Sequence, residues 1–153
     1  MSDFLDASVL VEACLSQSPS FAKADALIKK ENITSSHALA ETYATLSGDK
    51  RLRIRPKEAA QMVSDLAEHL TVETLSPEET ISLIRRAPDR GTAGGSIYDA
   101  LHAAVAKKRN CAVIHTLNVS HFRHVAAEMN IQDLRQGETW VGPSLRLGRL
   151  NCS

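Results

Sequence analysis

Three acidic residues of this 153-residue chain lie where carboxylates could share one metal ion. Asp6 closes the short apolar stretch Phe4-Leu5, and an acid at the end of a buried strand is well placed to hold a cation. Glu41 and Asp99 lie on segments with helical spacing, off the faces that their apolar neighbours define. Carboxylate and water oxygens are the ligands that Mg²⁺ and Mn²⁺ prefer. Clustered in one cleft, the three carboxylates would form a site for a divalent cation.

Each of the three acids also has a purely structural interpretation. Asp6 precedes a predicted helix and could be its N-cap. Asp99 comes three residues after Ser96 and could complete a capping box. Glu41, with Thr45 one turn away on the same side, could be a solvated helix carboxylate. Local spacing leaves both interpretations open at all three positions.

Short apolar segments alternate with amphipathic helices along the chain, which predicts an α/β fold. Strands are predicted at residues 4–6, 32–35, 71–75 and 111–115. Helices are predicted at residues 8–15, 21–28, 36–48, from 56, from 77, at 96–109 and at 118–128. Ser36 is expected to cap the third of these helices, and Ser76 is expected to begin the fifth through a capping box with Glu79. Residues 131–134 and 139–141 are both candidates for the final strand, and the pattern does not choose between them. Such an alternation favours a mostly parallel sheet with helices on both faces.

The composition indicates one globular domain. Hydrophobic residues make up 43% of the chain, and 18 basic residues balance 18 acidic ones. These values exclude a disordered chain and a protein that binds nucleic acid through bulk charge. No apolar run approaches the ~18–20 residues of a membrane span, and the acidic N-terminus differs from a signal peptide, so a cytoplasmic location is expected. Cys14 and Cys111 are expected to be buried thiols, and with Cys152 they form neither a disulfide framework nor a zinc motif.

Four segments together resemble the PIN-domain nucleases, especially the VapC-type toxins of bacterial toxin–antitoxin pairs. They are FLDASVLVEA (4–13), SSHALAETYATLSG (35–48), GGSIYDALHAAVAKKRNCAVIHTLN (94–118) and NVSHF (118–122). The resemblance predicts a PIN domain over residues 1–142, followed by a C-terminal tail over residues 143–153. It implies a three-layer α/β sandwich in which helices flank a mostly parallel sheet of about five strands.

The resemblance also implies an activity, a ribonuclease that depends on Mg²⁺ or Mn²⁺. Asp6, Glu41 and Asp99 would be the metal ligands, and Asn118 would be the fourth catalytic position. The family often has Asp at this last position and sometimes Asn, which supplies a neutral oxygen. An RNA substrate, an antitoxin partner and a homodimer are expected on the same grounds. The alternative is a PIN-fold module that binds RNA or protein without cutting, which Asn118 and the zero net charge favour.

Five further residues could support this chemistry. Ser8 and Thr116 could orient a ligand or a phosphate through their hydroxyl groups, or could cap the local backbone. His102 shares a helix face with Asp99 and could line the cleft or serve the core. Arg51 and Arg53 would lie on one side of the basic run 49–57 if that run is extended. They could grip RNA phosphates or an acidic partner segment, or belong to a solvated loop.

The six histidines show no spacing typical of a metal cluster. His121 and His124 are three residues apart on a predicted helix, without an acidic partner nearby in the sequence. They are expected to lie at the surface or to bond to the backbone. A phosphoacceptor receiver domain is disfavoured, because Asp6 has no acidic neighbour after the first strand and no suitably placed Lys follows a late Ser or Thr.

Overall fold

The structure, a computed structural model, describes residues 1–135 and 139–140 of the chain. Its strands are β1 (Phe4–Leu5), β2 (Ile33–Ser35), β3 (Thr71–Glu73), β4 (Val113–Thr116), β5 (Asn130–Asp133) and β6 (Thr139–Trp140). Its helices are α1 (Ala7–Cys14), α2 (Phe21–Ile28), α3 (Ser36–Gly48), α4 (Pro56–His69), α5 (Pro77–Arg86), α6 (Ser96–Lys108) and α7 (Val119–Val125). Two 3₁₀ turns, η1 (Lys50–Leu52) and η2 (Pro88–Arg90), connect them.

The strands form one sheet in the order β3-β2-β1-β4-β5-β6. The first five are parallel, and β6 pairs antiparallel with β5. The prediction of a mostly parallel sheet of about five strands is therefore confirmed, and both candidates for the final strand form strands. The chain builds outward from β1 to β3 and then from β4 to β5 on the other side. The carboxyl ends of β1 and β4 thus meet at a topological switch point, where open α/β sheets bind ligands.

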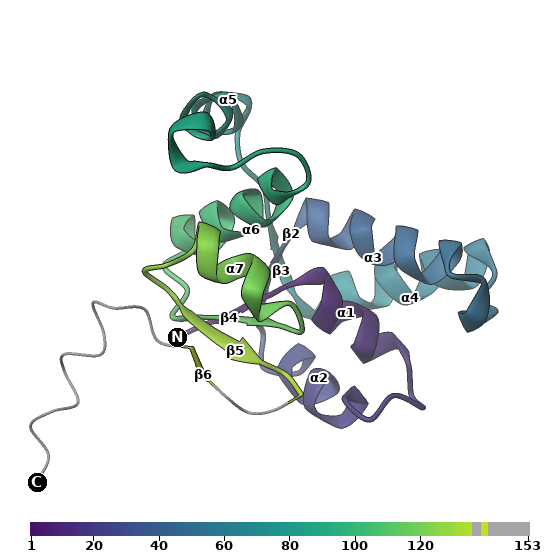
Figure 1. The fold of residues 1–153 in the computed structure, drawn as a ribbon. Coiled ribbons are helices and arrows are strands. Elements are labelled where there is room, and N and C mark those ends of the chain that lie inside the picture. Colours follow the sequence, from purple (N-terminus) through teal and green to yellow (C-terminus); the bar gives the residue numbers. More distant parts are fainter. Residues whose placement is uncertain (136–138, 141–153) are drawn as a thin grey trace, which may run out of the picture.

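Helices cover both faces of the sheet, so the predicted three-layer sandwich is confirmed (Figure 1). Successive strand residues point to opposite faces, and Phe4 and Leu5 of the central strand β1 enter different cores. Phe4 packs into a cluster with residues of α6 and α7, including Val105 and Phe122. Leu5 packs into a second cluster with residues of α1, α2, α3 and α4, including Leu10.

Helix starts follow local capping chemistry. Ser76 accepts from the backbone N–H of Glu79, whose side chain accepts from the backbone N–H of Ser76, so the predicted capping box of α5 is confirmed. The cap of α3 is Ser35, which accepts a hydrogen bond from Ala38 N. The prediction that Ser36 caps this helix is wrong by one residue, because β2 runs directly into α3.

The buried face of α6 differs from the predicted one. The sequence predicted burial of Ile97, Leu101, Ala104 and Val105 and placed His102 and Ala106 on another face. In the structure Val105, His102 and Ala106 are buried, whereas the other three are half-buried. Burial of a histidine is tolerated here because both ring nitrogens of His102 have hydrogen-bond partners. Helix α7 is also shorter than predicted and ends at Val125.

The two cysteines in the described part of the chain are free thiols. Cys111 is buried as predicted, whereas Cys14 is only half-buried. Burial raises the pKa of each thiol to about 11, so both are protonated at neutral pH. Among the described helices, none combines the length and the apolar character that a membrane span requires. Cys152 and the predicted tail, residues 143–153, lie outside the described residues.

Candidate active site

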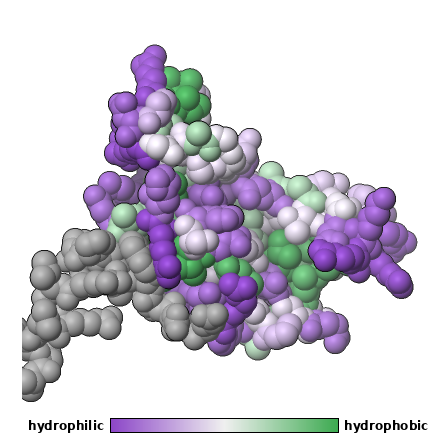
Figure 2. All heavy atoms as spheres, in the orientation of Figure 1, coloured by the Kyte–Doolittle hydropathy of each residue, from purple (hydrophilic) through white to green (hydrophobic). Residues whose placement is uncertain are grey.

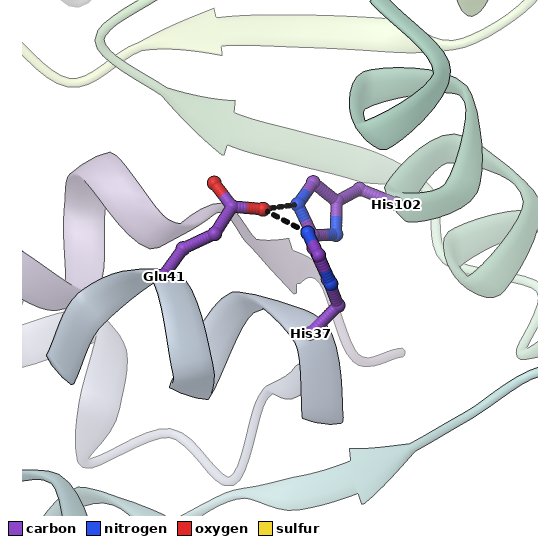
Figure 3. Close-up of side chains that lie close together, drawn as sticks. All are labelled: His37, Glu41 and His102. Atoms are coloured by element: carbon purple, nitrogen blue, oxygen red, sulfur yellow. Dashed lines mark hydrogen bonds and ion pairs between the residues drawn. The ribbon is translucent and has the colours of Figure 1, made fainter. Parts of the chain in front are cut away.

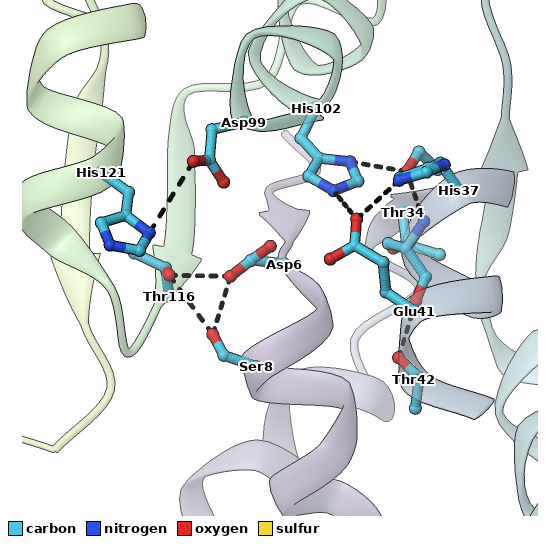
Figure 4. A network of polar contacts seen from close by, with 12 residues as sticks. Asp6, Ser8, Thr34, His37, Glu41, Thr42, Asp99, His102, Thr116 and His121 are labelled. Carbon is cyan, nitrogen blue, oxygen red and sulfur yellow. Dashed lines mark hydrogen bonds and ion pairs between the residues drawn. The ribbon is translucent and has the colours of Figure 1, made fainter. Parts of the chain in front are cut away.

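A cleft of about 740 Å³ opens at the switch point between β1 and β4. Asp6, Glu41, Asp99 and Asn118, the four residues predicted to be catalytic, all line it. They come from the end of β1, from α3, from α6 and from the start of α7. Figure 4 shows the three carboxylates pointing from these elements toward one another. The tertiary structure therefore brings together side chains that lie far apart in the sequence.

Asp6 is held by two hydroxyl groups rather than by a helix. It occupies the N-cap position of α1 but makes no side-chain capping hydrogen bond. Its Oδ2 instead accepts hydrogen bonds from Ser8 Oγ at 2.8 Å and from Thr116 Oγ1 at 2.9 Å. Only 5% of Asp6 is exposed, so its direction is set by these two donors.

Ser8 and Thr116 bond to the backbone as well as to Asp6. Besides donating to Asp6, Ser8 Oγ accepts from Leu117 N at 3.0 Å, and Thr116 Oγ1 accepts from Asn118 N at 2.9 Å. The hydroxyl pair thus ties the loop after β4 to the start of α1. Asn118 is the N-cap of α7, but its side chain makes no capping hydrogen bond. Its amide is therefore not committed to the helix and lines the cleft.

Asp99 carries an unfavourable negative charge. Burial and the nearby charge of Asp6 raise its pKa, with a smaller contribution from Glu41, and the histidines His121 and His102 offset part of this effect. Its Oδ2 lies 3.7 Å from His121 Nδ1. The alternative of a capping box with Ser96 does not form, because the Ser96 hydroxyl donates to the Ala93 carbonyl. A cation among these carboxylates would relieve the repulsion.

Glu41 lies between the cleft and a pair of histidines. Its Oε1 lies 2.8 Å from His102 Nε2 and 3.0 Å from His37 Nε2. Burial alone would raise the pKa of Glu41, but the hydrogen bond from His102 and the charges of both histidines outweigh it and lower the pKa. Glu41 is therefore ionised at neutral pH and is not the freely solvated carboxylate of the alternative interpretation.

These opposite pKa shifts predict opposite stability changes in EDTA. A carboxyl whose folded pKa is raised destabilises the fold when ionised, so Asp99→Asn should raise the thermal midpoint at pH 7. This advantage should shrink as the pH falls through the raised pKa toward the ordinary value of about 3.9. Glu41→Gln should lower the midpoint at pH 7, because a depressed pKa contributes stability above the unfolded value. Thermal unfolding between pH 4 and 8 measures both, and midpoints that shift in the same direction would contradict the assigned environments.

Three histidines around the site were given no functional role from the sequence. His121 and His124 are exposed, as predicted, and both line the cleft, where Asp99 Oδ2 lies 3.7 Å from His121 Nδ1. His37 was not singled out, although its spacing of four residues from Glu41 on one helix was a usable signal. His37, Glu41 and His102 form a compact group of potential metal ligands, which the spacing of the histidines did not predict (Figure 3).

The basic run 49–57 is not extended. Residues 50–52 form η1, and Arg53 has a left-handed φ of 54°, so the condition under which Arg51 and Arg53 would lie on one side is not met. Asp49 caps the turn and pairs with Arg51 at 2.8 Å. Figure 2 shows the hydrophilic side chains gathered where α3 and α4 meet. Arg51 and Arg53 do not line the cleft, and their contact with RNA or a partner stays a prediction.

The donor set of the cleft fits a hard divalent cation. Asp6, Glu41 and Asp99 offer carboxylate oxygens, and Asn118 adds a neutral amide oxygen. Burial raises the pKa of Asp99, and the charges of Asp6 and Glu41 raise it further, so a cation beside Asp99 would favour its ionised form. Oxygen ligands of this kind suit Mg²⁺ and Mn²⁺ rather than softer metals.

Comparisons with known proteins agree with this architecture. The structure is similar to that of VapC20 from Mycobacterium tuberculosis, described as a toxin that cleaves the sarcin–ricin loop, with 20% identity and a TM-score of 0.59 over 74% of this chain and 87% of that chain. It is also similar to PAE2754 from Pyrobaculum aerophilum, with 21% identity and a TM-score of 0.58 over 81% of this chain and 86% of that chain. No curated protein matches the sequence significantly. The family model of the PIN domain matches residues 4–128, which is most of the chain, and the protein therefore belongs to the PIN domain family.

Proposed function

We propose that this protein is an endoribonuclease that requires Mg²⁺ or Mn²⁺ and serves as the toxin of a toxin–antitoxin pair in the cytoplasm. The convergence of Asp6, Glu41 and Asp99 on one cleft carries the proposal. Membership of the PIN family and the structural similarity to a VapC toxin support it. The active-site roles proposed for the three carboxylates follow from their oxygen chemistry.

The carboxylates would hold the cation, and the neighbouring groups would hold the carboxylates. A bound Mg²⁺ or Mn²⁺ would neutralise the scissile phosphate, activate a water molecule and stabilise the leaving oxygen. Ser8 and Thr116 hold one oxygen of Asp6 and leave the other for the cleft. Asn118 offers a neutral oxygen that can bind a cation or one of its waters. His121, whose Nδ1 lies 3.7 Å from Asp99 Oδ2, would be available to bind an RNA phosphate.

A cleavage assay with single-stranded and structured RNA tests the proposal. Cleavage is expected with Mg²⁺ or Mn²⁺ and is expected to stop in EDTA, because the carboxylates alone repel a phosphodiester. Activity that survives EDTA would contradict metal dependence. Binding of RNA without cleavage under any metal condition would favour the alternative, a binding module, which the amide at Asn118 supports.

The RNA products should carry 5′-phosphate and 3′-hydroxyl ends. Water attacks the phosphorus in line, its oxygen stays on the phosphate, and the 3′ oxygen leaves with a proton. The two histidines among the described residues that line the cleft, His121 and His124, lie one turn apart on α7 rather than on opposite walls, which does not suit an acid and base pair for attack by the 2′-hydroxyl. Mass spectrometry of the fragments distinguishes the products, and 2′,3′-cyclic phosphates would rule this mechanism out.

An antitoxin should inhibit by placing a positive side chain on the carboxylates. An Arg against Asp6, Glu41 and Asp99 would substitute for the charge of the cation. The affinity for the antitoxin should therefore be higher in EDTA and should fall as Mn²⁺ rises, which isothermal titration calorimetry measures. An affinity that is equal in EDTA and in excess Mn²⁺ would exclude this mode of inhibition. The homodimer expected from the family resemblance stays a prediction, which sedimentation would test.

A further inference from the structure

Glu41 faces a group of nitrogen ligands on the side away from Asp6. His37 and Glu41 lie one turn apart on α3, and His102 reaches them from α6 (Figure 3). One ligand atom from each of the three residues lies within 4.8 Å of the others. Both histidines direct Nε2 at the same oxygen, Oε1 of Glu41, at 2.8 Å for His102 and 3.0 Å for His37. Two imidazoles and one carboxylate therefore point at a single small volume.

Contacts on their far sides hold both histidine rings in place. His102 is fully buried, and its Nδ1 is 2.8 Å from Ser35 Oγ. His37 stacks on Tyr98, with ring centroids 4.7 Å apart and an interplanar angle of 12°. Histidines that ligate metals are usually fixed through the other ring nitrogen, as His102 is here, and Ser35 Oγ can accept a hydrogen bond from Nδ1–H of His102 once Nε2 binds a cation.

We propose that His37, Glu41 and His102 form a second cation site, specific for a borderline transition metal such as Zn²⁺. Zinc takes two histidines and a carboxylate with bonds of about 2.0–2.2 Å, which separates neighbouring ligand atoms by about 3.3 Å. The N···O separations of 2.8 and 3.0 Å need only a small outward movement to reach this value. The side chains of His37 and Glu41 are 34% and 39% exposed, so a water molecule can complete a tetrahedral shell.

Nitrogen ligands separate this site chemically from the cleft. Mg²⁺ prefers an all-oxygen environment, whereas imidazole suits Zn²⁺, Co²⁺ and related metals. The sites share Glu41, whose second oxygen points toward Asp6 (Figure 4). A divalent cation at the histidines neutralises the charge of Glu41 and adds positive charge beside the cleft. Zinc should thus weaken Mn²⁺ or Mg²⁺ binding by Asp6 and Asp99, a consequence that rests on the proposed function.

Cobalt titration of the untagged full chain tests the site without any measurement of nuclease activity. Co²⁺ in a tetrahedral site with nitrogen ligands gives visible absorption bands, and Zn²⁺ should abolish them at one equivalent. His37→Gln should lower the Co²⁺ and Zn²⁺ affinities by more than about tenfold, because loss of a ligand exceeds the effect of an outer-shell change. His69→Gln is the matched control, since this exposed histidine lies on α4 and should leave both affinities unchanged.

The double variant Asp6→Asn/Asp99→Asn separates this proposal from the proposed function. It should keep the Co²⁺ spectrum and the Zn²⁺ affinity of the wild type, whatever its nuclease activity. Loss of Zn²⁺ binding in this variant, or an unchanged Zn²⁺ affinity in folded His37→Gln, would overturn the histidine site.

In the wild type, one equivalent of Zn²⁺ should raise the dissociation constant for Mn²⁺, measured by electron paramagnetic resonance, and His37→Gln should remove this effect. If the protein binds Co²⁺ at the histidines but binds no Mn²⁺ in the cleft, the proposed nuclease function is refuted and the histidine site still stands.

Discussion

The variant Asp99→Ala is expected to lose RNA cleavage by roughly 10³-fold or more while its fold is retained. Asp99 lines the cleft together with Asp6 and Glu41, and removal of one carboxylate leaves an incomplete set of oxygen ligands. Folding should persist, because the charge at Asp99 is unfavourable in the absence of a cation. Initial rates of cleavage at saturating Mg²⁺, with circular dichroism as a check of folding, measure both outcomes.

Two comparisons make this prediction specific. Asp89→Ala removes an exposed acid of η2 that does not line the cleft, and it should cleave RNA at the wild-type rate. Asp6→Ala should be as inactive as Asp99→Ala, and combining the two should cost little more, because ligands of one cation act as a unit. Wild-type rates for Asp99→Ala would refute the assignment of the metal site.

The variant Phe4→Ala is expected to lower the free energy of unfolding by about 3–5 kcal/mol. Phe4 is completely buried in the central strand β1, and its ring lies 5.8 Å from that of His102. Truncation leaves a cavity in the core shared by the sheet, α6 and α7. Domains are stable by only about 5–15 kcal/mol, so this loss is a large part of the total. Denaturant unfolding with a fitted m-value measures it.

An exposed apolar residue provides the control for this core substitution. Ile81 on α5 is 47% exposed, and Ile81→Ala removes apolar atoms that contribute little to the core. Its expected cost is within about 0.5 kcal/mol. Equal costs for Phe4→Ala and Ile81→Ala would contradict the central position of β1 in the fold.

Structural features that depend on only a few neighbouring residues were predictable from the sequence. The Ser76 capping box and the apolar segments that became β1, β2, β3 and β4 follow from caps and periodicity within a few residues. The sequence left the conformation of the basic run 49–57 open, and a local interaction decides it. Asp49 binds the backbone and the side chain of Arg51, which closes a turn instead of leaving an extended segment.

The hydrophobic periodicity of the sequence could not predict contacts between residues on different helices and strands. His121 meets Asp99, and His102 meets Glu41 and Ser35, through the packing of α6 against α7 and β2. Periodicity placed His102 on the same face as Asp99, away from the predicted buried face of its helix, because it counts a histidine as polar. The structure buries this ring because partners on other elements satisfy both nitrogens.

The amino-acid pattern alone identifies the residues that offer oxygen ligands and shows which of them follow a predicted strand. Asp6 ends an apolar segment of the sequence, whichever strands lie beside that segment in the fold. The alternation of apolar segments and amphipathic helices favours a parallel sheet with helices on both faces. Which of these side chains meet depends on how the strands are ordered in the sheet. The strand order sets β1 beside β4, and this pairing brings Thr116, 110 positions away, to 2.9 Å from Asp6. Local propensity acts over a few residues, whereas the order of strands depends on burying both faces of the whole sheet at once.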